Sequence, residues 1–450
     1  MSEQFNNVYE DLEWRNAIAH ATPGAREILS RDKITCYNGF DPTAKSLHVG
    51  NLVPIMGLVR MQHYGHTPIV IVGGGTGMIG DPSGRSDERK LLTVENIDEN
   101  VTGIQKQLES FLDFSPSLSN PARVINNADW LRKVSLIEFL RDVGKHFSIS
   151  TMLGRESVQT RMDREVGISF TEFSYQLLQA YDFLKLYEDY NCTFQMGGSD
   201  QWGNILGGVD LIRRVHGGAV SDGSDAANRE AAESLAQALA YPLITTSTGE
   251  KFGKSVGGAP TLDPDQTSPY RLYQFFFNTA DADAAPYLKL FTMLKKSRIE
   301  ELERAVQEAP RERAAQQALA TEMTRTVHGD RGLDEALRVT NALFSDDLRK
   351  LSATELRGAF AEATHGMVRP ADLAEGITLA SAVTVHGGGM IASASDLRRL
   401  VSQGAIKING KVETDPLRSL TSADFIDDQV MVVQRGKKSH DLIWLEPDRR

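Results

Sequence analysis

Residues 34–51 read ITCYNGFDPTAKSLHVGN. The first seven form a short run of mainly apolar side chains, which predicts a buried strand. The apolar positions that follow recur at helical spacing until Gly65, so a helix is expected to open near Gly50. A loop between a strand end and a helix N-terminus carries free backbone N–H groups in a positive potential, and Thr43 and His48 can donate to phosphate oxygens. This stretch therefore predicts an anion-binding loop in an α/β domain.

Three further apolar runs have the length of strands, and helix-length periodic segments lie between them; the runs are 68–72, 123–126 and 193–196. Strands that alternate with helices are typical of a parallel sheet covered by helices. We therefore expect a Rossmann-like α/β catalytic domain over residues 1–245. Residues 215–240 are rich in Gly, Ser, Asp and Ala, and we predict a surface insertion there that ends in a polar helix.

The pattern after Asp263 is helical until about Phe344, which predicts a helical domain over residues 246–345 and a linker over 346–378. A small α+β module is expected at 379–450. In that module Ser395 is predicted to cap a short helix that ends at Gly404. Two alternating isoleucines then predict a strand that leads into the Asn409-Gly410 turn.

The bulk composition limits the class of protein. A chain of 450 residues is long enough for several domains, and no segment has the roughly 18 to 20 uncharged apolar residues of a membrane span, so a cytoplasmic protein is expected. The net charge of −11 argues against indiscriminate nucleic-acid binding but leaves room for a local basic patch. Two cysteines, Cys36 and Cys192, are too few for a disulfide framework or a zinc site.

Two glycine motifs point to other nucleotide-binding folds but do not satisfy them. Residues 75–80 match the dinucleotide fingerprint GxGxxG, but Asp81-Pro82-Ser83-Gly84 prolongs the loop where a helix should open. This argues against a dehydrogenase. Residues 249–255 end like a Walker phosphate loop, but three residues separate the glycines where that loop needs four.

The same segment carries Lys251 and Lys254, three residues apart on a glycine-bearing loop. Two ammonium groups on such a loop can stabilise charge that moves toward pyrophosphate. The order of this loop after the 41–51 loop, with a parallel sheet between them, resembles the signature pair of the class I aminoacyl-tRNA synthetases. Further motifs narrow the resemblance to the bacterial tyrosyl-tRNA synthetase family: YNGFDPT at 37–43, GDPSG at 80–84, FTEFSY at 170–175, QAYD at 179–182 and GGSDQW at 197–202.

The resemblance covers nearly the whole chain from residue 34, with two departures in the signatures. Asn51 stands where the family more often has a second histidine, and the lysine loop reads KFGKS instead of KMSKS. Asn51 can still donate a hydrogen bond, so we expect altered tuning and not loss of activity. Arg85 stands where relatives often carry lysine, which keeps the charge but changes the donor geometry.

Tyr175, Gln179 and Asp182 are spaced at i, i+4 and i+7, so a helix through them presents all three side chains on one face. The resemblance implies that this face lines an amino-acid pocket. It assigns Asp182 and Tyr37 to the tyrosine hydroxyl. The residues implied to hold the rest of the amino acid are Tyr175, Gln179, Asp81 and Gln201.

The resemblance also implies an ATP site built from Gly39, Asp41, His48, Gly50, Asn51, Gly198, Asp200 and Lys254. Its implied phosphate-side catalytic groups are Thr43, His48, Asn51, Arg85, Arg89, Lys251 and Lys254. In such a reaction the tyrosine carboxylate attacks the α-phosphorus of ATP, and a tRNA ribose hydroxyl then attacks the adenylate, so that positioning and electrostatics suffice. Magnesium is expected to arrive with ATP, because the sequence offers no metal-ligand spacing.

The C-terminal unit resembles a small RNA-binding module shared with a ribosomal small-subunit protein. The cations implied to face RNA are Arg398, Arg399, Lys407, Lys411, Arg435, Lys437 and Lys438. The family also implies a homodimer in which one tRNA touches both subunits. A tryptophan-specific relative and a non-catalytic RNA-binding paralogue remain as alternatives. Tyr37 and Asp182 favour a phenol over an indole, and intact signatures favour an enzyme.

These assignments predict that the two half-reactions can be separated. A chain that stops near Gly376 should form tyrosyl-adenylate but charge tRNA poorly, because the ATP and tyrosine residues precede Val256 and the RNA-facing cations follow Ser395. The remaining tRNA binding should depend less steeply on salt, since each lost phosphate contact removes roughly one unit of slope. Adenylate formation and tRNA charging are measured on both chains at two salt concentrations. Equal charging by both chains contradicts the RNA role of the module.

Overall fold

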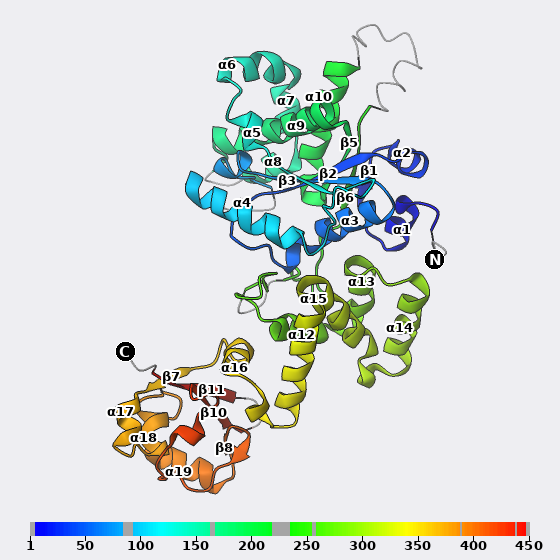
Figure 1. Ribbon diagram of the computed structural model, residues 1–450. Coiled ribbons are helices and arrows are strands. Elements are labelled where there is room, and N and C mark those ends of the chain that lie inside the picture. The colour runs from blue at the N-terminus through cyan, green and yellow to red at the C-terminus, as the bar shows by residue number, and fades with distance from the viewer. Residues whose placement is uncertain are drawn as a thin grey trace. The chain divides into compact units, whose positions relative to one another are not determined.

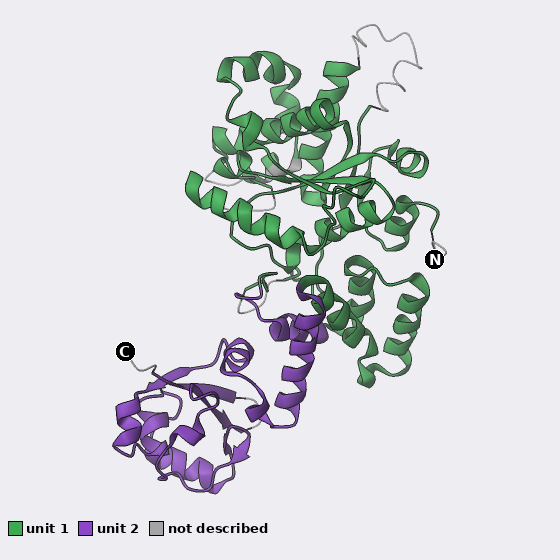
Figure 2. Cartoon of the chain, in the orientation of Figure 1, with its two compact units in different colours: residues 1–263, 278–327 green, residues 264–277, 328–450 purple. Residues whose placement is uncertain are grey.

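The computed structural model describes residues 5–83, 93–162, 167–217, 235–253, 258–387, 389–436 and 439–446. The chain forms two compact units (Figures 1 and 2). The first contains residues 1–263 and 278–327, and the second contains residues 264–277 and 328–450. The helical segment expected as one domain over 246–345 is thus divided between the two units.

The first unit is built on a six-stranded sheet with the order β1-β6-β5-β2-β3-β4. The strands are β1 (His20–Ala21), β2 (Thr35–Phe40), β3 (Thr67–Val72), β4 (Arg123–Asn126), β5 (Cys192–Gly198) and β6 (Gln237–Tyr241). Strands β2 to β6 pair in parallel, and β1 runs antiparallel to β6. The four strands expected from the sequence and the parallel α/β class are confirmed.

Central strands of this sheet are buried on both faces, as helix-covered parallel strands must be. In β3, five consecutive residues from Pro68 to Val72 are buried. Figure 1 shows α9 (Phe170–Tyr190) and α10 (Trp202–His216) on one face, with α3 (Leu52–His63) and α4 (Val94–Leu108) on the other. The two cysteines are buried free thiols of this core.

The expectation of a surface insertion over residues 215–240 that ends in a polar helix is wrong for the last residues of this range. Residues 218–234 lie outside the described ranges, but Gln237–Tyr241 form β6, in which all five residues are buried. The residues Gln, Ala and Leu in QALAY have high intrinsic helix propensity. Its ladders with β5 on one side and β1 on the other make it a strand.

The remaining helices of the first unit surround the sheet or follow the 235–263 segment. They are α1 (Val8–Trp14), α2 (Ala25–Arg31), α5 (Ala128–Leu131), α6 (Leu136–Glu138), α7 (Ile149–Leu153), α8 (Glu156–Met162), α13 (Asp281–Phe291), α14 (Lys296–Glu308) and the first part of α15 (Ala314–Phe344). Helix α15 is interrupted at Gly329, whose φ of 69° and ψ of −177° are accessible essentially to glycine alone. None of the helices in the described part of the chain combines the length and apolarity that a membrane span requires.

The second unit contains a five-stranded sheet with the order β7-β11-β10-β8-β9. Its elements are α12 (Pro269–Phe277), the end of α15, α16 (Ala353–Ala359), β7 (His365–Val368), α17 (Pro370–Ala374), α18 (Leu379–Thr384), α19 (Ala394–Ser402), β8 (Ile406–Ile408), β9 (Lys411–Val412), β10 (Val430–Arg435) and β11 (Ser439–Leu445). The Asn409-Gly410 turn is confirmed, with φ values of 48° and 85°. The cap of α19 is Ser393, whose side chain accepts from the N–H of Asp396, and not Ser395.

The segment expected as a linker contributes structure to this second sheet. Strand β7 pairs in parallel with β11, and Val368 belongs to the apolar core of the unit. The sequence could not reveal this, because the partner strand lies more than 70 residues later in the chain. A chain that stops at Gly376 therefore leaves β7 without its neighbour, so a cut that removes the sheet whole must precede His365.

Candidate active site

A cavity of about 260 Å³ opens at the carboxyl ends of β2 and β5 in the first unit. Ligands of parallel α/β sheets bind at this edge, because loops from neighbouring strands converge there. All six residues expected on the amino-acid side line the cavity: Tyr37, Asp81, Tyr175, Gln179, Asp182 and Gln201. The lining residues from the ATP and phosphate sets are Gly39, Asp41, Thr43, His48, Asn51 and Gly198.

The other expected site residues lie near the cavity or outside the described ranges. Gly50, Asp200 and Lys251 are not among its lining residues. Arg85, Arg89 and Lys254 lie outside the part of the chain that the structure describes.

Helix α9 presents three of the lining side chains, as the i, i+4, i+7 spacing predicted. Ser169 caps the helix by accepting a hydrogen bond from the N–H of Glu172 at 3.3 Å. Tyr175 and Asp182 are buried, and the Oε1 atom of Gln179 is buried without a hydrogen-bond partner among the described residues. The helix therefore directs a polar stripe inward, away from solvent.

Asp182 is a buried, hydrogen-bonded acid in the lining of the cavity. Asn127 Nδ2 donates to its Oδ2 at 2.8 Å, and Trp130 Nε1 donates to its Oδ1 at 2.7 Å. Burial raises the pKa of the Asp182 carboxyl to about 7, although the two donors lower that pKa. The nearby Tyr37 hydroxyl is also buried, and it forms no hydrogen bond with any described residue. A ligand hydroxyl can pair with both groups.

The sequence analysis did not identify Asn127 and Trp130. Both follow directly after β4, at the same edge of the sheet as the other site loops. Functional residues gather at the carboxyl ends of parallel strands. Because a strand was expected at 123–126, this rule could have identified the residues that follow it as candidates for the site.

Asp81 occupies a second acidic position in the cavity. Its Oδ1 accepts from the N–H of Ser83 at 3.0 Å, and its Oδ2 accepts from Gln201 Nε2 at 2.6 Å. Burial and the charge of Asp41 raise the pKa of the Asp81 carboxyl to about 6. Three carboxylates line the cavity, while none of its described lining residues is Lys or Arg. The cavity therefore favours a ligand with a positively charged group.

A chain of hydrogen bonds connects Asp41 with Asp182. Asp41 accepts from the hydroxyls of Tyr175 at 3.2 Å and Thr76 at 3.1 Å. Thr76 in turn accepts from Asn127 Nδ2 at 3.0 Å, and Asn127 also donates to Asp182. Because each side chain is oriented by the next, the polar lining is preorganised before a ligand binds.

The first signature loop forms a capped helix start next to the cavity. His48 Nδ1 accepts from the N–H of Gly50 at 3.0 Å, and Asn51 Oδ1 accepts from the N–H of His48 at 3.0 Å. With Nδ1 as acceptor, a neutral His48 ring carries its proton on Nε2, where it can donate to an anion. The asparagine at position 51, where the family more often has histidine, thus stabilises the start of the helix.

The two signature segments lie against each other. Val49 N donates to Pro260 O at 2.9 Å, and Leu262 N donates to Leu47 O at 2.8 Å. A side chain at Gly253, whose φ is 83°, would lie 3.2 Å from Val49 Cγ2. Main-chain pairing thus joins the anion-binding loop to residues 260–262, which follow the lysine segment, and Gly253 of the lysine segment lies beside Val49.

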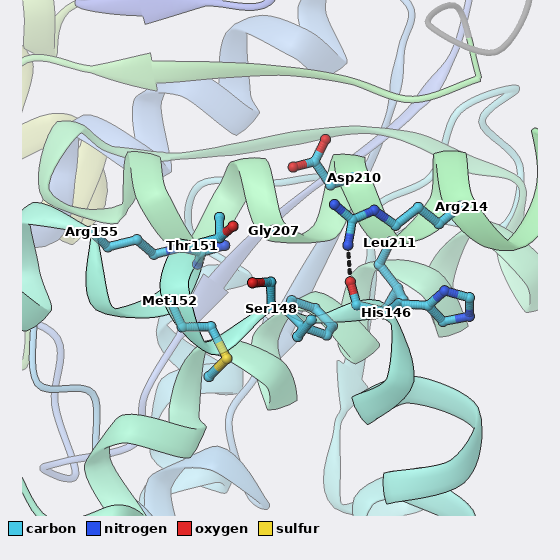
Figure 3. A pocket seen from close by; sticks show the side chains of 10 residues that line it. His146, Ser148, Thr151, Met152, Arg155, Gly207, Asp210, Leu211 and Arg214 are labelled. Atoms are coloured by element: carbon cyan, nitrogen blue, oxygen red, sulfur yellow. Dashed lines mark hydrogen bonds between the residues drawn. The ribbon is translucent and has the colours of Figure 1, made fainter. Parts of the chain in front are cut away.

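A second cavity, of about 20 Å³, lies between α7 and α10 (Figure 3). Arg155, Asp210 and Arg214 contribute to its lining, and Arg214 donates to the main-chain oxygen of His146. Its volume suits about one water molecule and no substrate. The larger cavity is the candidate active site.

The expected RNA-facing cations differ in their surroundings. Arg399, Lys407 and Arg435 form ion pairs with Asp396, Asp346 and Asp441, whereas Arg398 and Lys411 are exposed, and Lys437 and Lys438 lie outside the described residues. Paired residues of an antiparallel ladder share a face of the sheet. Lys411 pairs with Ile408 and Lys407 pairs with Val412, so the two lysines lie on opposite faces of the β8–β9 hairpin.

Comparisons with known proteins agree with this geometry. The family of tRNA synthetases class I (W and Y) matches residues 29–345, and the tyrosine--tRNA ligase SYY-like C-terminal domain matches residues 371–443. The tyrosine--tRNA ligase of Staphylococcus carnosus is 46% identical over 97% of this chain and 99% of its own length. The tyrosine--tRNA ligase of Roseiflexus castenholzii is also 46% identical, with the same coverage.

Among solved structures, a C-terminally truncated mitochondrial tyrosyl-tRNA synthetase of Aspergillus nidulans is 33% identical, with a TM-score of 0.66. That match covers 76% of this chain and 95% of the other. The fold, the edge-of-sheet cavity and the two joined signature segments define a class I tRNA synthetase of the tryptophan and tyrosine group, and the chain belongs to that family. Within the family, its full-length matches group it with the tyrosine--tRNA ligases.

The raised pKa of Asp182 predicts how tyrosine binding depends on pH. An ionised carboxylate accepts from a phenol more strongly than a protonated carboxyl group does, and the pKa of this group lies at about 7. We expect the KM for tyrosine to rise about 10-fold between pH 8 and pH 6, because the ionised fraction falls by that factor across the pKa.

The Asp182→Asn variant is the control for this prediction. It should bind tyrosine more weakly at every pH and lose the change near pH 7, while the Asp81 carboxyl, with a pKa of about 6, still titrates. The KM is measured by pyrophosphate exchange at constant ionic strength. A wild-type KM that is flat from pH 8 to pH 6 contradicts the assignment.

Proposed function

We propose that the 260 Å³ cavity is where this tyrosine--tRNA ligase activates tyrosine with ATP to form tyrosyl-adenylate and pyrophosphate, before it transfers tyrosine to the 3′ end of tRNA(Tyr). The observation that carries the proposal is the buried pair of Asp182 and Tyr37 in its lining. There Asp182 already has two donors, and the Tyr37 hydroxyl still lacks a described partner. A tyrosine hydroxyl that donates to Asp182 and accepts from Tyr37 completes both.

This arrangement favours tyrosine over phenylalanine. Without a ligand hydroxyl, the buried polar groups would remain unpaired in a water-poor site, and an unsatisfied buried group costs about 1–3 kcal/mol. The same groups disfavour tryptophan, whose indole cannot accept a hydrogen bond.

The α-amino group of tyrosine is assigned to the acidic part of the cavity. Asp81, Tyr175, Gln179 and Gln201 surround this region, and the Gln179 Oε1 atom can accept from an ammonium group. An ammonium also keeps Asp81 ionised, because an opposite charge nearby stabilises the carboxylate.

ATP is assigned to the cavity edge next to the first signature. Thr43 and His48 donate to its phosphates, the Asn51 cap holds the helix start beneath them, and Gly39, Asp41, Gly50, Gly198 and Asp200 contact the nucleoside. The carboxylate of tyrosine attacks the α-phosphorus and pyrophosphate leaves. Cations at Lys251, Lys254, Arg85 and Arg89 stabilise the charge that develops on the leaving phosphates. Magnesium binds through the ATP oxygens and adds positive charge there.

Transfer to tRNA uses the second unit as well as the cavity. Arg398 and Lys411 are exposed cations of the C-terminal module, and we assign RNA backbone contacts to them and to the other cations of the set. The ribose hydroxyl at the 3′ end of tRNA then attacks the adenylate carbonyl, the new ester bond forms, and AMP leaves. Because tRNA and ATP meet in the bacterial cytoplasm, we place the enzyme there.

A homodimer is the proposed assembly. The first unit exposes large apolar side chains within residues 136–170: Leu136 at 70%, Ile137 at 71%, Leu140 at 49%, Ile149 at 60% and Phe170 at 80%. Apolar side chains of this size are rarely exposed together on a monomer. We propose that a second copy of the chain covers them.

The function is tested by pyrophosphate exchange into ATP with each of the twenty amino acids. Tyrosine should support exchange far above the other nineteen, and tRNA(Tyr) should then be charged. Exchange that tryptophan supports best, or no exchange with any amino acid, overturns the proposal.

The lysine segment is predicted to act on the transition state. Lys251→Ala should lower kcat for adenylate formation at least 10-fold and leave the KM for tyrosine within about 2-fold, because the ammonium group meets the phosphates only as charge moves onto pyrophosphate. Single-turnover and steady-state rates separate the two effects. A change seen mainly in the tyrosine KM removes Lys251 from this role.

The dimer is predicted to depend on Phe170. Phe170→Glu should shift the chain toward a monomer in sedimentation velocity, because a carboxylate buried in an apolar interface remains unpaired there. The exposed Leu417→Glu substitution in the second unit is the matched control and should change nothing. A wild-type monomer at micromolar concentration contradicts the proposed assembly.

A further inference from the structure

Asp283, in the first turn of α13, holds the hairpin that carries Lys251. Its Oδ1 accepts from the N–H of Ser247 at 2.9 Å, and its Oδ2 accepts from the Ser247 hydroxyl at 3.2 Å. The carboxyl is 8% exposed. A buried carboxylate with two donors on one residue fixes both the position and the orientation of that residue.

The hairpin itself is closed by main-chain bonds. Thr246 N donates to Glu250 O at 2.7 Å, and Phe252 N donates to Ile244 O at 3.0 Å. Lys251 lies on the returning strand, opposite Thr245. Because Ser247 and Lys251 belong to the same short hydrogen-bonded hairpin, a fixed Ser247 also fixes the position of Lys251.

The next residue, Phe252, is held by the same helix. Its ring centroid lies 4.9 Å from that of Tyr287 and 5.0 Å from that of Phe291, and the side chain is 8% exposed. Asp283, Tyr287 and Phe291 are spaced at i, i+4 and i+8, so they share one face of α13. This aromatic contact gives a physical reason for the phenylalanine in KFGKS, where class I signatures more often have methionine.

Two buried arginines connect the opposite end of α13 to helices α1 and α3. Arg60 Nη2 donates to the main-chain oxygens of Lys289 at 3.0 Å and Thr292 at 2.8 Å. Arg15 Nη1 donates to the same two oxygens at 2.9 Å and 3.0 Å. Arg60 belongs to α3, whose first turn follows the His48 loop. Helix α13 is thus joined at one end to the lysine hairpin and at the other to the helix of the first signature.

We propose that α13 positions the lysine segment for catalysis, with Asp283 and Tyr287 as positioning residues that act through Lys251. This inference rests on the proposed role of Lys251 in adenylate formation. Loss of the Asp283 contact frees the hairpin, so that Lys251 reaches the transition state less often while the tyrosine pocket is unchanged. A small displacement of a charged group is enough, because transition-state stabilisation depends steeply on geometry.

The experiment compares two acids in the first turn of the same helix. Asp283→Ala should lower the single-turnover rate of adenylate formation about 10-fold, with the KM for tyrosine within about 2-fold of wild type. Asp281→Ala is the matched control, because Asp281 bonds to Gln316 and not to the hairpin. Its rate should stay within about 2-fold. Ser247→Ala removes only one of the two hydrogen bonds and should lower the rate about 3-fold. This variant replaces Asp283→Ala in the test if Asp283→Ala does not fold.

A double-mutant cycle distinguishes positioning from general destabilisation. In the Lys251→Ala background, Asp283→Ala should lower the rate by less than about 2-fold, because its effect is transmitted through a group already removed. Phe252→Met should retain most activity and Phe252→Ala should lose about 10-fold, since methionine can still contact Tyr287 and Phe291.

Two results overturn the inference: an Asp283→Ala rate equal to that of Asp281→Ala, or effects of Asp283→Ala and Lys251→Ala that multiply independently. The wild-type enzyme provides the separate test of function. If it fails to form tyrosyl-adenylate, the proposed function falls. If it forms the adenylate and the cycle shows no coupling, only the role of α13 falls.

Discussion

Strand β2 lies between β3 and β5 in a parallel ladder, and the site depends on that pairing. Parallel neighbours end at the same edge of a sheet, so the loops after β2, β3 and β5 converge on one cavity. The first loop carries His48, the second carries Asp81, and the third carries Gln201. A shift of one residue in the β2 register would turn the Tyr37 side chain, now in the core cluster beside Phe183, to the other face of the sheet.

Burial in that cavity controls the chemistry of its acids. Desolvation is the largest cause of the raised pKa of both Asp81 and Asp182, and the hydrogen bonds to each group oppose it. A buried carboxyl group that accepts two hydrogen bonds can still ionise near neutral pH. Without those bonds, a carboxyl group at the same depth would hold its proton far more tightly. The partners Asn127, Trp130 and Gln201 therefore limit how far burial raises the pKa of each acid.

The two departures from the class signatures have local structural causes. Asn51 accepts from the N–H of His48 and so completes the cap of the short helix at Val49–Asn51. Phe252 fills an aromatic cluster on α13 that methionine would fill less completely. In each case the substituted side chain contacts a neighbouring segment: Asn51 bonds to the main chain of His48, and Phe252 packs against α13.

Local pattern alone determined the strands at 35–40, 67–72 and 123–126, the shared face of Tyr175, Gln179 and Asp182, and the Asn409-Gly410 turn. Periodicity, caps and turn residues act over a few positions, so these features can be inferred from neighbouring residues. Long-range contacts decided the rest. Gln237–Tyr241 became a strand because β1 and β5 flank it, and His365–Val368 joined the second sheet because β11 pairs with it. Asn127 and Trp130 reach Asp182 across more than 50 residues, and Asp283 reaches Ser247 across 36. Hydrogen bonding and desolvation depend on distances in space that no sequence spacing specifies, and only the folded chain sets them.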